Sequence, residues 1–179
     1  VAWSLGGKAV NMASALFVGI LIARYLGPES YGLMNYVISY VAIFSIIATF
    51  GMDNIEIREL SRQNDKKDAI MGTCFCLRMF FATIAYIVIA ISLFYFQTDK
   101  FTSLMVLAYG LTLFTGTGNL LRNYFTSIVQ NKYIVKSEMY RTFVGAGIKI
   151  LLLWIKAPLE YFIYAQIFDT ALVLSLIHI

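Results

Sequence analysis

Polar residues recur along the otherwise apolar stretch 102–129 at a spacing suited to ligand binding. The stripe consists of Thr112, Thr115, Asn119, Arg122 and Thr126, which are separated by three or four residues. That spacing stacks the side chains on one face of an α-helix. A helix that faces only lipid has no use for such a stripe, whereas a helix that lines a wet cavity does. We therefore expect these residues to face water.

A second stripe follows within 134–155, and the charges near the apolar stretches are mostly positive. The second stripe consists of Glu138, Arg141, Thr142, Gly145 and Lys149. The cations within or beside apolar stretches are Arg24, Arg78, Arg122, Arg141 and Lys149, and the acidic residues are Glu138 and Asp169. Such residues normally face a bundle interior or water. A cationic cavity favours an anion, and the fork of arginine suits phosphate because it can bind two oxygens.

Structural roles are the alternative for several of these residues. Arg122 and Arg141 are also placed to snorkel to lipid headgroups, and Arg24 to anchor the chain at the other interface. Structural pairs are a further alternative: Glu138 with Arg141 or Thr142, and Asp169 with Lys149.

The composition that surrounds these residues is that of an integral membrane protein. Hydrophobic residues make up 60% of the 179 residues, charged residues only 13%, and the mean hydropathy is +0.75. Soluble domains carry about 25% charged residues. The only two cysteines, Cys74 and Cys76, lie at the start of an apolar stretch and are expected to pack as small apolar residues.

We predict an all-α fold with about six transmembrane helices. The expected helices cover about 8–26, 33–51, 70–96, 102–129, 134–155 and 160–177. Gly27-Pro28 separates the first two, because neither residue suits a helix interior. Asp53 and Glu56 resemble a capping box, which predicts a short surface helix after Gly51.

The distribution of Lys and Arg predicts the orientation in the membrane. Nine of them fall on the side of the N-terminus, which carries the loops 53–69 and 130–137. Three fall on the other side, namely Arg24, Lys100 and Lys156. The excess places the N-terminus and those loops in the cytoplasm.

No catalytic motif is recognisable in the sequence. It has no Ser-His-Asp set, no paired acidic motif, no metal-ligand cluster and no glycine-rich phosphate loop. We therefore expect no enzyme, no cofactor and no metal, and the basic stretches need no nucleic acid in a membrane context.

Four blocks of the sequence are distinctive: residues 3–8 (WSLGGK), 23–32 (ARYLGPESYG), 50–62 (FGMDNIEIRELSR) and 129–133 (VQNKY). The first two resemble the N-terminal signature of the polysaccharide-export flippases of the Wzx type, in the multidrug/oligosaccharidyl-lipid/polysaccharide superfamily, and the third resembles the second block of that family. Residues 129–133 (VQNKY) resemble it more loosely. The resemblance spans essentially the whole chain.

The resemblance implies that the chain is most of the N-terminal lobe of a transporter with 12 to 14 helices. It further implies alternating access, a polyprenyl-pyrophosphate-linked oligosaccharide as cargo and a place in the cytoplasmic membrane, with glycan polymerase or assembly proteins as candidate partners. Arg24 and Arg58 lie inside matching blocks and are candidate substrate-binding residues. The charge and stripe arguments add Arg78, Asn119, Arg122 and Lys149 as substrate-binding candidates, and Glu138 and Asp169 as candidates for proton or sodium coupling.

Three other functions stay open from sequence alone. A multidrug exporter of the same superfamily predicts acidic rather than cationic cavity residues. A membrane enzyme of glycan assembly predicts longer external loops than this chain has. A scaffold of a glycan-assembly complex predicts polar stripes that face a dry helix partner. Because the chain starts at Val1 and stops inside an apolar stretch, we also expect it to be a fragment.

Overall fold

The computed structural model describes residues 2–62, 67–96, 99–127 and 131–177, and this part of the chain is helical without a strand. The elements are α1 (Ala2–Thr49), α2 (Met52–Arg62), α3 (Lys67–Tyr95), α4 (Lys100–Gly110), α5 (Thr112–Thr115), η2 (Gly116–Gly118), α6 (Asn119–Ser127), α7 (Asn131–Trp154) and α8 (Leu159–Ile177). They confirm the all-α prediction. Residues 129 and 130 of the fourth family-like block lie outside the described residues.

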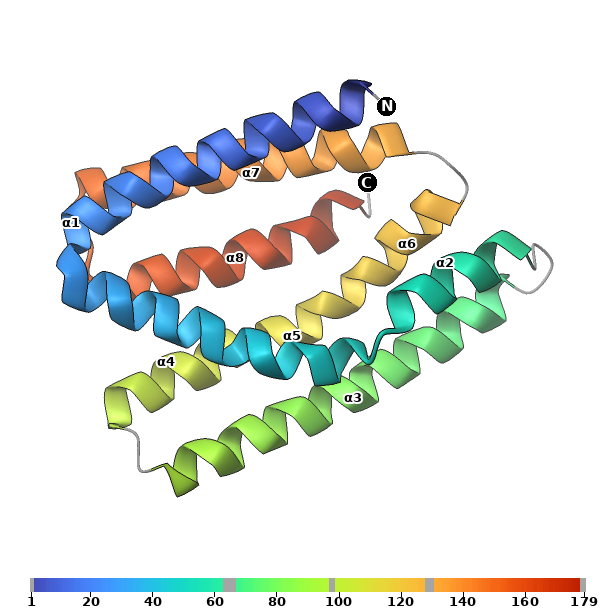
Figure 1. Ribbon diagram of the computed structural model, residues 1–179, viewed down its shortest axis with the longest axis horizontal. Coiled ribbons are helices and arrows are strands. Elements are labelled where there is room, and N and C mark those ends of the chain that lie inside the picture. The colour runs from blue at the N-terminus through green and yellow to red at the C-terminus, as the bar shows by residue number, and fades with distance from the viewer. Residues whose placement is uncertain (1, 63–66, 97–98, 128–130, 178–179) are drawn as a thin grey trace.

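The predicted break between the first two helices is a sharp bend inside α1. Gly27 has φ 73° and ψ 172°. Only glycine adopts this backbone conformation without a steric penalty, because it has no Cβ atom. Pro28 follows and cannot donate the next helical hydrogen bond. The two legs of α1 therefore run back on each other (Figure 1).

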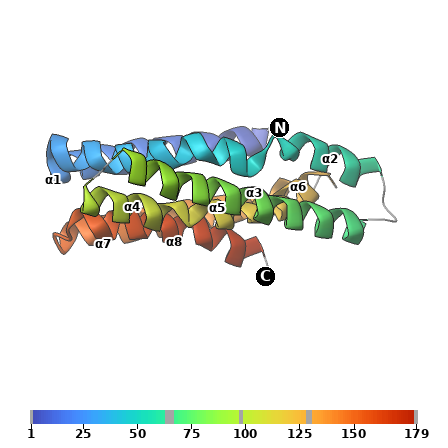
Figure 2. The same ribbon diagram turned by 90° about the horizontal axis from the view of Figure 1, so that it is seen from below.

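The helices lie lengthwise in a flat bundle, with α1 along one face and α7 and α8 along the other (Figure 2). The bend of α1 and the connection from α7 to α8 are at the same end, where the Tyr25 hydroxyl donates to the Ala157 carbonyl over 3.3 Å. The helix α2 lies at the opposite end. One core cluster joins the second leg of α1 to α3 and α4 through Val37, Ile89 and Val106.

The outside of the bundle is apolar, as a lipid-facing surface must be. Trp154 is 88% exposed and Phe94 is 85% exposed. Three helical stretches are long and apolar enough to cross a membrane, namely Met12–Arg62, which includes the α1 bend, Lys67–Tyr95 and Lys100–Tyr124. We conclude that this is a multi-pass membrane protein.

The predicted continuous helix 102–129 is wrong in its middle. The chain forms α4, α5, the 3-10 turn η2 and α6 in succession. The hydroxyls of Thr112, Thr115 and Thr117 donate to carbonyls three residues earlier, at 2.6 to 2.8 Å. Such local bonds compete with the α-helical ladder, and Gly116 and Gly118 add no side chain to hold it.

One connection lies outside the spanning helices and carries a well-defined cap. Asp99 is the N-cap residue of α4, and its carboxylate accepts a hydrogen bond from the Thr102 backbone N–H at 2.9 Å. This bond holds the pKa of the Asp99 carboxyl below its ordinary value, because it stabilises the charged form.

Candidate functional site: a charged cavity between α1, α7 and α8

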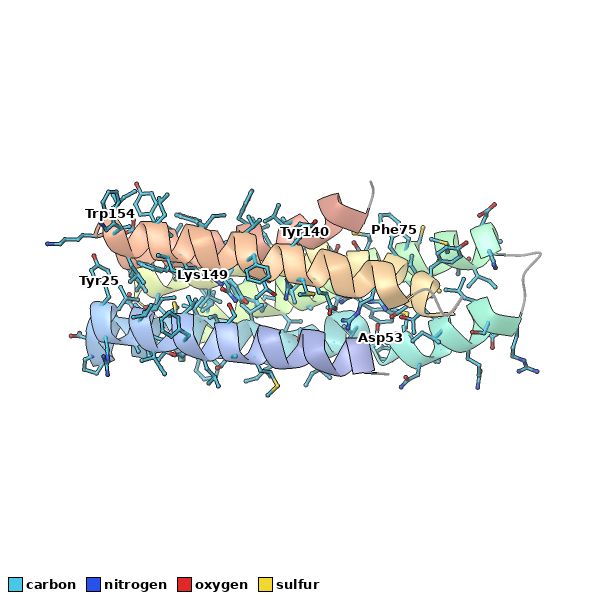
Figure 3. The ribbon with its side chains drawn as sticks, turned by 90° about the horizontal axis from the view of Figure 1, so that it is seen from above. Tyr25, Asp53, Phe75, Tyr140, Lys149 and Trp154 are labelled. Carbon is cyan, nitrogen blue, oxygen red and sulfur yellow. The ribbon has the colours of Figure 1, made fainter. Side chains whose placement is uncertain are left out.

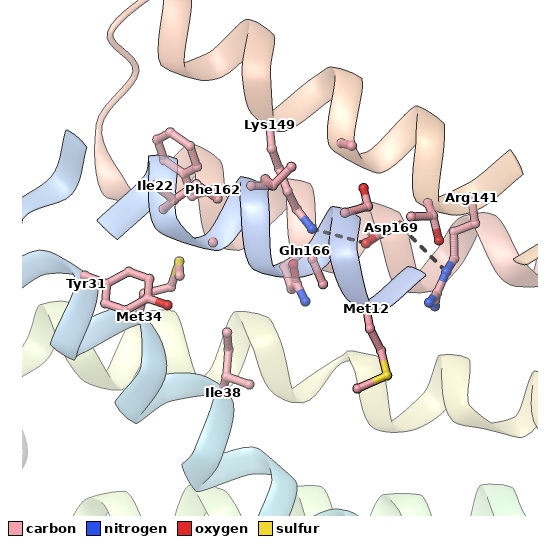
Figure 4. A pocket seen from close by; sticks show the side chains of 16 residues that line it. Met12, Ile22, Tyr31, Met34, Ile38, Arg141, Lys149, Phe162, Gln166 and Asp169 are labelled. Carbon is pink, nitrogen blue, oxygen red and sulfur yellow. Dashed lines mark hydrogen bonds and ion pairs between the residues drawn. The ribbon is translucent and has the colours of Figure 1, made fainter. Parts of the chain in front are cut away.

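A cavity of about 440 Å³ lies between the two legs of α1, α7 and α8. We call it the charged cavity, because Arg141 and Lys149 from α7 and Asp169 from α8 line it (Figure 4). Its other polar lining residues include Ser14, Tyr31, Thr142 and Gln166. In Figure 3, Lys149 points from α7 toward α1, whereas Trp154 points away from the bundle.

The spacing on α7 positions the two cations on either side of a small residue. Arg141, Gly145 and Lys149 are four residues apart, which places them on one helical face. A Cβ atom built on Gly145 would lie 2.7 Å from Oδ1 of Asp169. The carboxylate of Asp169 therefore packs directly against the backbone of α7, between the two cations.

Asp169 is shared unequally between the cations. Lys149 Nζ donates to Asp169 Oδ2 at 3.3 Å, and the two side chains are 16% and 17% exposed. Arg141 Nε lies 3.9 Å from Oδ1, beyond hydrogen-bond distance. Among the described residues neither of these two atoms has a hydrogen-bond partner.

The charged cavity therefore has a surplus of one positive charge and spare hydrogen-bonding capacity. Among the described residues that line it, two cations face a single carboxylate, and Arg141 is still 36% exposed. The amide of Gln166 also has no hydrogen-bond partner among the described residues. A phosphate group matches this arrangement because arginine, lysine and amide N–H groups all donate to its oxygens.

Arg78 lies in a different, buried network. Its Nε donates to Glu56 Oε1 at 2.6 Å and its Nη2 to Glu56 Oε2 at 2.7 Å. Nη2 also donates to Asp53 Oδ1, and the Asn123 amide donates to both carboxylates. Arg78 is 2% exposed and Glu56 is 1% exposed. The network ties α2 to α3 and α6.

This network corrects the capping-box interpretation of Asp53 and Glu56. The helix α2 begins at Met52, so Asp53 already lies in its first turn and is not the N-cap. Both carboxylates face Arg78 and Asn123 instead. The sequence did contain a signal for this arrangement. Two acidic residues, Asp53 and Glu56, precede an apolar stretch in which Arg78 has no acidic partner of its own.

The remaining candidates lie apart from the charged cavity. Arg24 is exposed near the α1 bend. Arg58 is also exposed and pairs with Glu59 at 3.3 Å. Arg122 pairs with Glu138 at 3.1 Å, with side chains 49% and 27% exposed.

Asn119 lines a second cavity, of about 280 Å³, together with Arg78. Of the predicted site residues, the structure thus brings together Lys149 and Asp169 in one cavity and Arg78 and Asn119 in another. The ion pair between Asp169 and Lys149, which the sequence offered as a structural alternative to a functional role, is present. Arg141 was not among the predicted substrate-binding residues, although its spacing from Lys149 indicated that both lie on the same helical face.

Comparison with known families adds an independent observation. A family model described as polysaccharide biosynthesis protein matches residues 1–178. The chain belongs to the polysaccharide biosynthesis protein family. This confirms the resemblance to polysaccharide flippases that the sequence blocks indicated. No curated protein and no solved structure gives a significant match.

The cations that line the charged cavity are hydrogen-bond donors, which suit an anion. No group of three His, Cys, Asp or Glu that could hold a metal ion occurs among the described residues. The charged cavity is consequently the site that we consider for function.

Proposed function

We propose that this polysaccharide biosynthesis protein is a flippase for polyprenyl-pyrophosphate-linked oligosaccharides in the cytoplasmic membrane. The observation that carries the proposal is the charged cavity, in which Arg141 and Lys149 share the single carboxylate of Asp169. The surplus positive charge of the cavity suits a pyrophosphate. The prenyl tail stays in the lipid beside the apolar outer surface of the bundle.

The proposed mechanism is an exchange of counter-ions. In the absence of cargo, Asp169 neutralises one of the two cations. The pyrophosphate oxygens then take the place of the Asp169 carboxylate on Lys149 Nζ and accept a hydrogen bond from Arg141 Nε, which has no partner among the described residues. Of the two candidates for proton or sodium coupling, Asp169 is therefore the better one, because Glu138 pairs with Arg122 away from this cavity.

The proposed setting of this site follows from the family resemblance. In this setting, the chain contributes about six membrane spans and has its N-terminus in the cytoplasm. These spans form most of the N-terminal lobe of a transporter with 12 to 14 helices. The two lobes would rock between inward- and outward-open states around the bound head group, as in other transporters built from repeats. Glycan polymerase and assembly proteins are the proposed partners that use the exported oligosaccharide.

The test is translocation of a fluorescent polyprenyl-pyrophosphate oligosaccharide in liposomes by the purified full-length protein that contains this chain. We expect the Arg141→Gln/Lys149→Gln double variant to lower the initial rate at least about tenfold, because each change removes a charged hydrogen bond. Lys156→Gln is the matched control, since Lys156 is an exposed cation at the end of the bundle and does not line the cavity.

Equal rates for the double variant and the control would contradict the role of the charged cavity. No translocation by the wild-type protein across several sugar heads would contradict the flippase function itself. Matched protein levels and melting temperatures are required for each variant.

A further inference from the structure

The second cavity has a lining quite different from that of the charged cavity. It lies between the second leg of α1, α3, α4, α5, η2, α6 and α8. Hydroxyl and amide side chains dominate its polar lining, namely Ser45, Thr49, Tyr109, Thr112, Thr117, Asn119 and Thr170. We call it the hydroxyl-lined cavity.

Its lining carries almost no free charge. Arg78 is the one charged side chain among the described residues that line it. Two of its nitrogens, Nε and Nη2, are already bonded to the carboxylates of Glu56 and Asp53. An anion gains little there, because the positive charge of Arg78 is compensated by these two carboxylates.

The cavity offers both hydrogen-bond donors and acceptors. Neither the Asn119 amide nor the Tyr109 hydroxyl has a hydrogen-bond partner among the described residues. The hydroxyls of Thr112 and Thr117 donate to the carbonyls of Tyr109 and Phe114, so their oxygens remain acceptors. A ligand with many hydroxyl groups matches this mixture, since each hydroxyl both donates and accepts.

The two cavities are immediate neighbours. The side chain of Ile38 lines both of them. On α8, Asp169 lines the charged cavity and the next residue, Thr170, lines the hydroxyl-lined cavity. The two cavities therefore share part of their walls, an arrangement suited to a ligand with its phosphate in the charged cavity and its adjoining group in the hydroxyl-lined cavity.

We propose that the hydroxyl-lined cavity binds the uncharged sugar ring that is attached to the pyrophosphate of the cargo. Its volume of about 280 Å³ is just below the range of small-molecule pockets, about 300–1,000 Å³, and suits a single ring rather than a chain. The inference rests on the proposed function and adds to it the place and chemistry of sugar recognition. Asn119 and Tyr109 are the residues that select for the ring.

The experiment measures how much a sugar adds to carrier binding. The purified protein in nanodiscs is titrated with a short-chain prenyl pyrophosphate and with the same carrier bearing one glucose, galactose or N-acetylglucosamine. The sugar increment is the Kd of the bare carrier divided by the Kd of the sugar-bearing carrier. We expect it to be about tenfold or more for at least one sugar.

The variants separate the two cavities. Asn119→Leu and Tyr109→Phe remove the groups proposed to bond the sugar, with little change in side-chain size. Together they should abolish the increment while the Kd of the bare carrier stays within about twofold. Thr115→Val is the matched control, because Thr115 is a hydroxyl residue of α5 that does not line the cavity. Lys149→Met should weaken binding of the bare carrier and of the sugar-bearing carrier alike.

Two results would overturn the inference: no increment in the wild type with any of the sugars, or an intact increment in a folded Asn119→Leu/Tyr109→Phe variant. In both cases the bare carrier would still bind through Arg141 and Lys149, so the proposed function would stand. Failure of the bare carrier to bind the wild type would instead count against the proposed function.

Discussion

Glu56 of α2 accepts two hydrogen bonds from the guanidinium of Arg78 on α3, at 2.6 and 2.7 Å, and both side chains are almost fully buried. Asp53 and Asn123 complete the network. The arrangement gives a structural reason for an arginine in an apolar helix. Its proposed role in substrate binding can be tested separately.

The first prediction concerns this buried pair. Arg78→Met should lower the free energy of unfolding by about 3–5 kcal/mol, because it leaves the Glu56 carboxylate buried without its partner. Glu56→Gln/Arg78→Met should recover much of that loss, since the buried carboxylate is then gone and the remaining one, Asp53, is 48% exposed to solvent. The measurement is the melting temperature in detergent. The control is Arg58→Met, which removes the exposed ion pair between Arg58 and Glu59.

Translocation by the stabilised double variant then decides the role of Arg78. Activity close to that of wild type would show that the arginine acts through structure. Loss of activity in a folded double variant would support direct contact with cargo.

The second prediction concerns the contact between Gly145 and Asp169. Gly145→Ala places a methyl group 2.7 Å from Oδ1 of Asp169, which is too close, so the carboxylate must move. We expect a loss of about 1–3 kcal/mol in stability. Gly147→Ala is the control on the same helix, because nothing lies within 4 Å of its Cβ position, and it should be neutral or stabilising. Equal melting temperatures for the two variants would rule out the close packing of Asp169 on α7.

The third prediction follows from the shared carboxylate in the charged cavity. Asp169→Asn keeps the size of the side chain but removes the internal competitor for Arg141 and Lys149. The affinity for inorganic pyrophosphate, measured by isothermal titration calorimetry, should rise about tenfold. A weaker or unchanged affinity in a folded variant would contradict the exchange of counter-ions.

The fourth prediction concerns the cap of α4 and its dependence on pH. The pKa of Asp99 is lowered in the folded protein by the Thr102 N–H, so the cap contributes stability above the ordinary pKa of 3.8. That contribution is lost as the pH falls through the lowered value. Asp99→Ala should lower the melting temperature at pH 7, and the difference from wild type should shrink at strongly acidic pH. Asp99→Asn, which can still accept the hydrogen bond, should be close to wild type at pH 7. A pH-independent difference for Asp99→Ala would contradict the assignment.

The amino-acid sequence by itself determined the class of protein, the main helices and the bend between the first two. Long apolar stretches can satisfy their backbone in lipid only as helices, and Gly27-Pro28 cannot continue one. The surplus of cations near those stretches and the family-like blocks also follow directly from residue order. The break of 102–129 into four elements did not, because it depends on threonine hydroxyls that bond to the local backbone.

Only the tertiary structure decided which charges meet. Arg78 is 22 residues from Glu56, and Asn123 is 67 residues from Glu56, so their pairing depends on how α2, α3 and α6 pack. The rotation of α7 against α8 likewise decides that Asp169 lies between Arg141 and Lys149, while Arg122 turns to Glu138. Helical periodicity gives the face on which a side chain lies, whereas the partner on that face is set by the neighbouring helix.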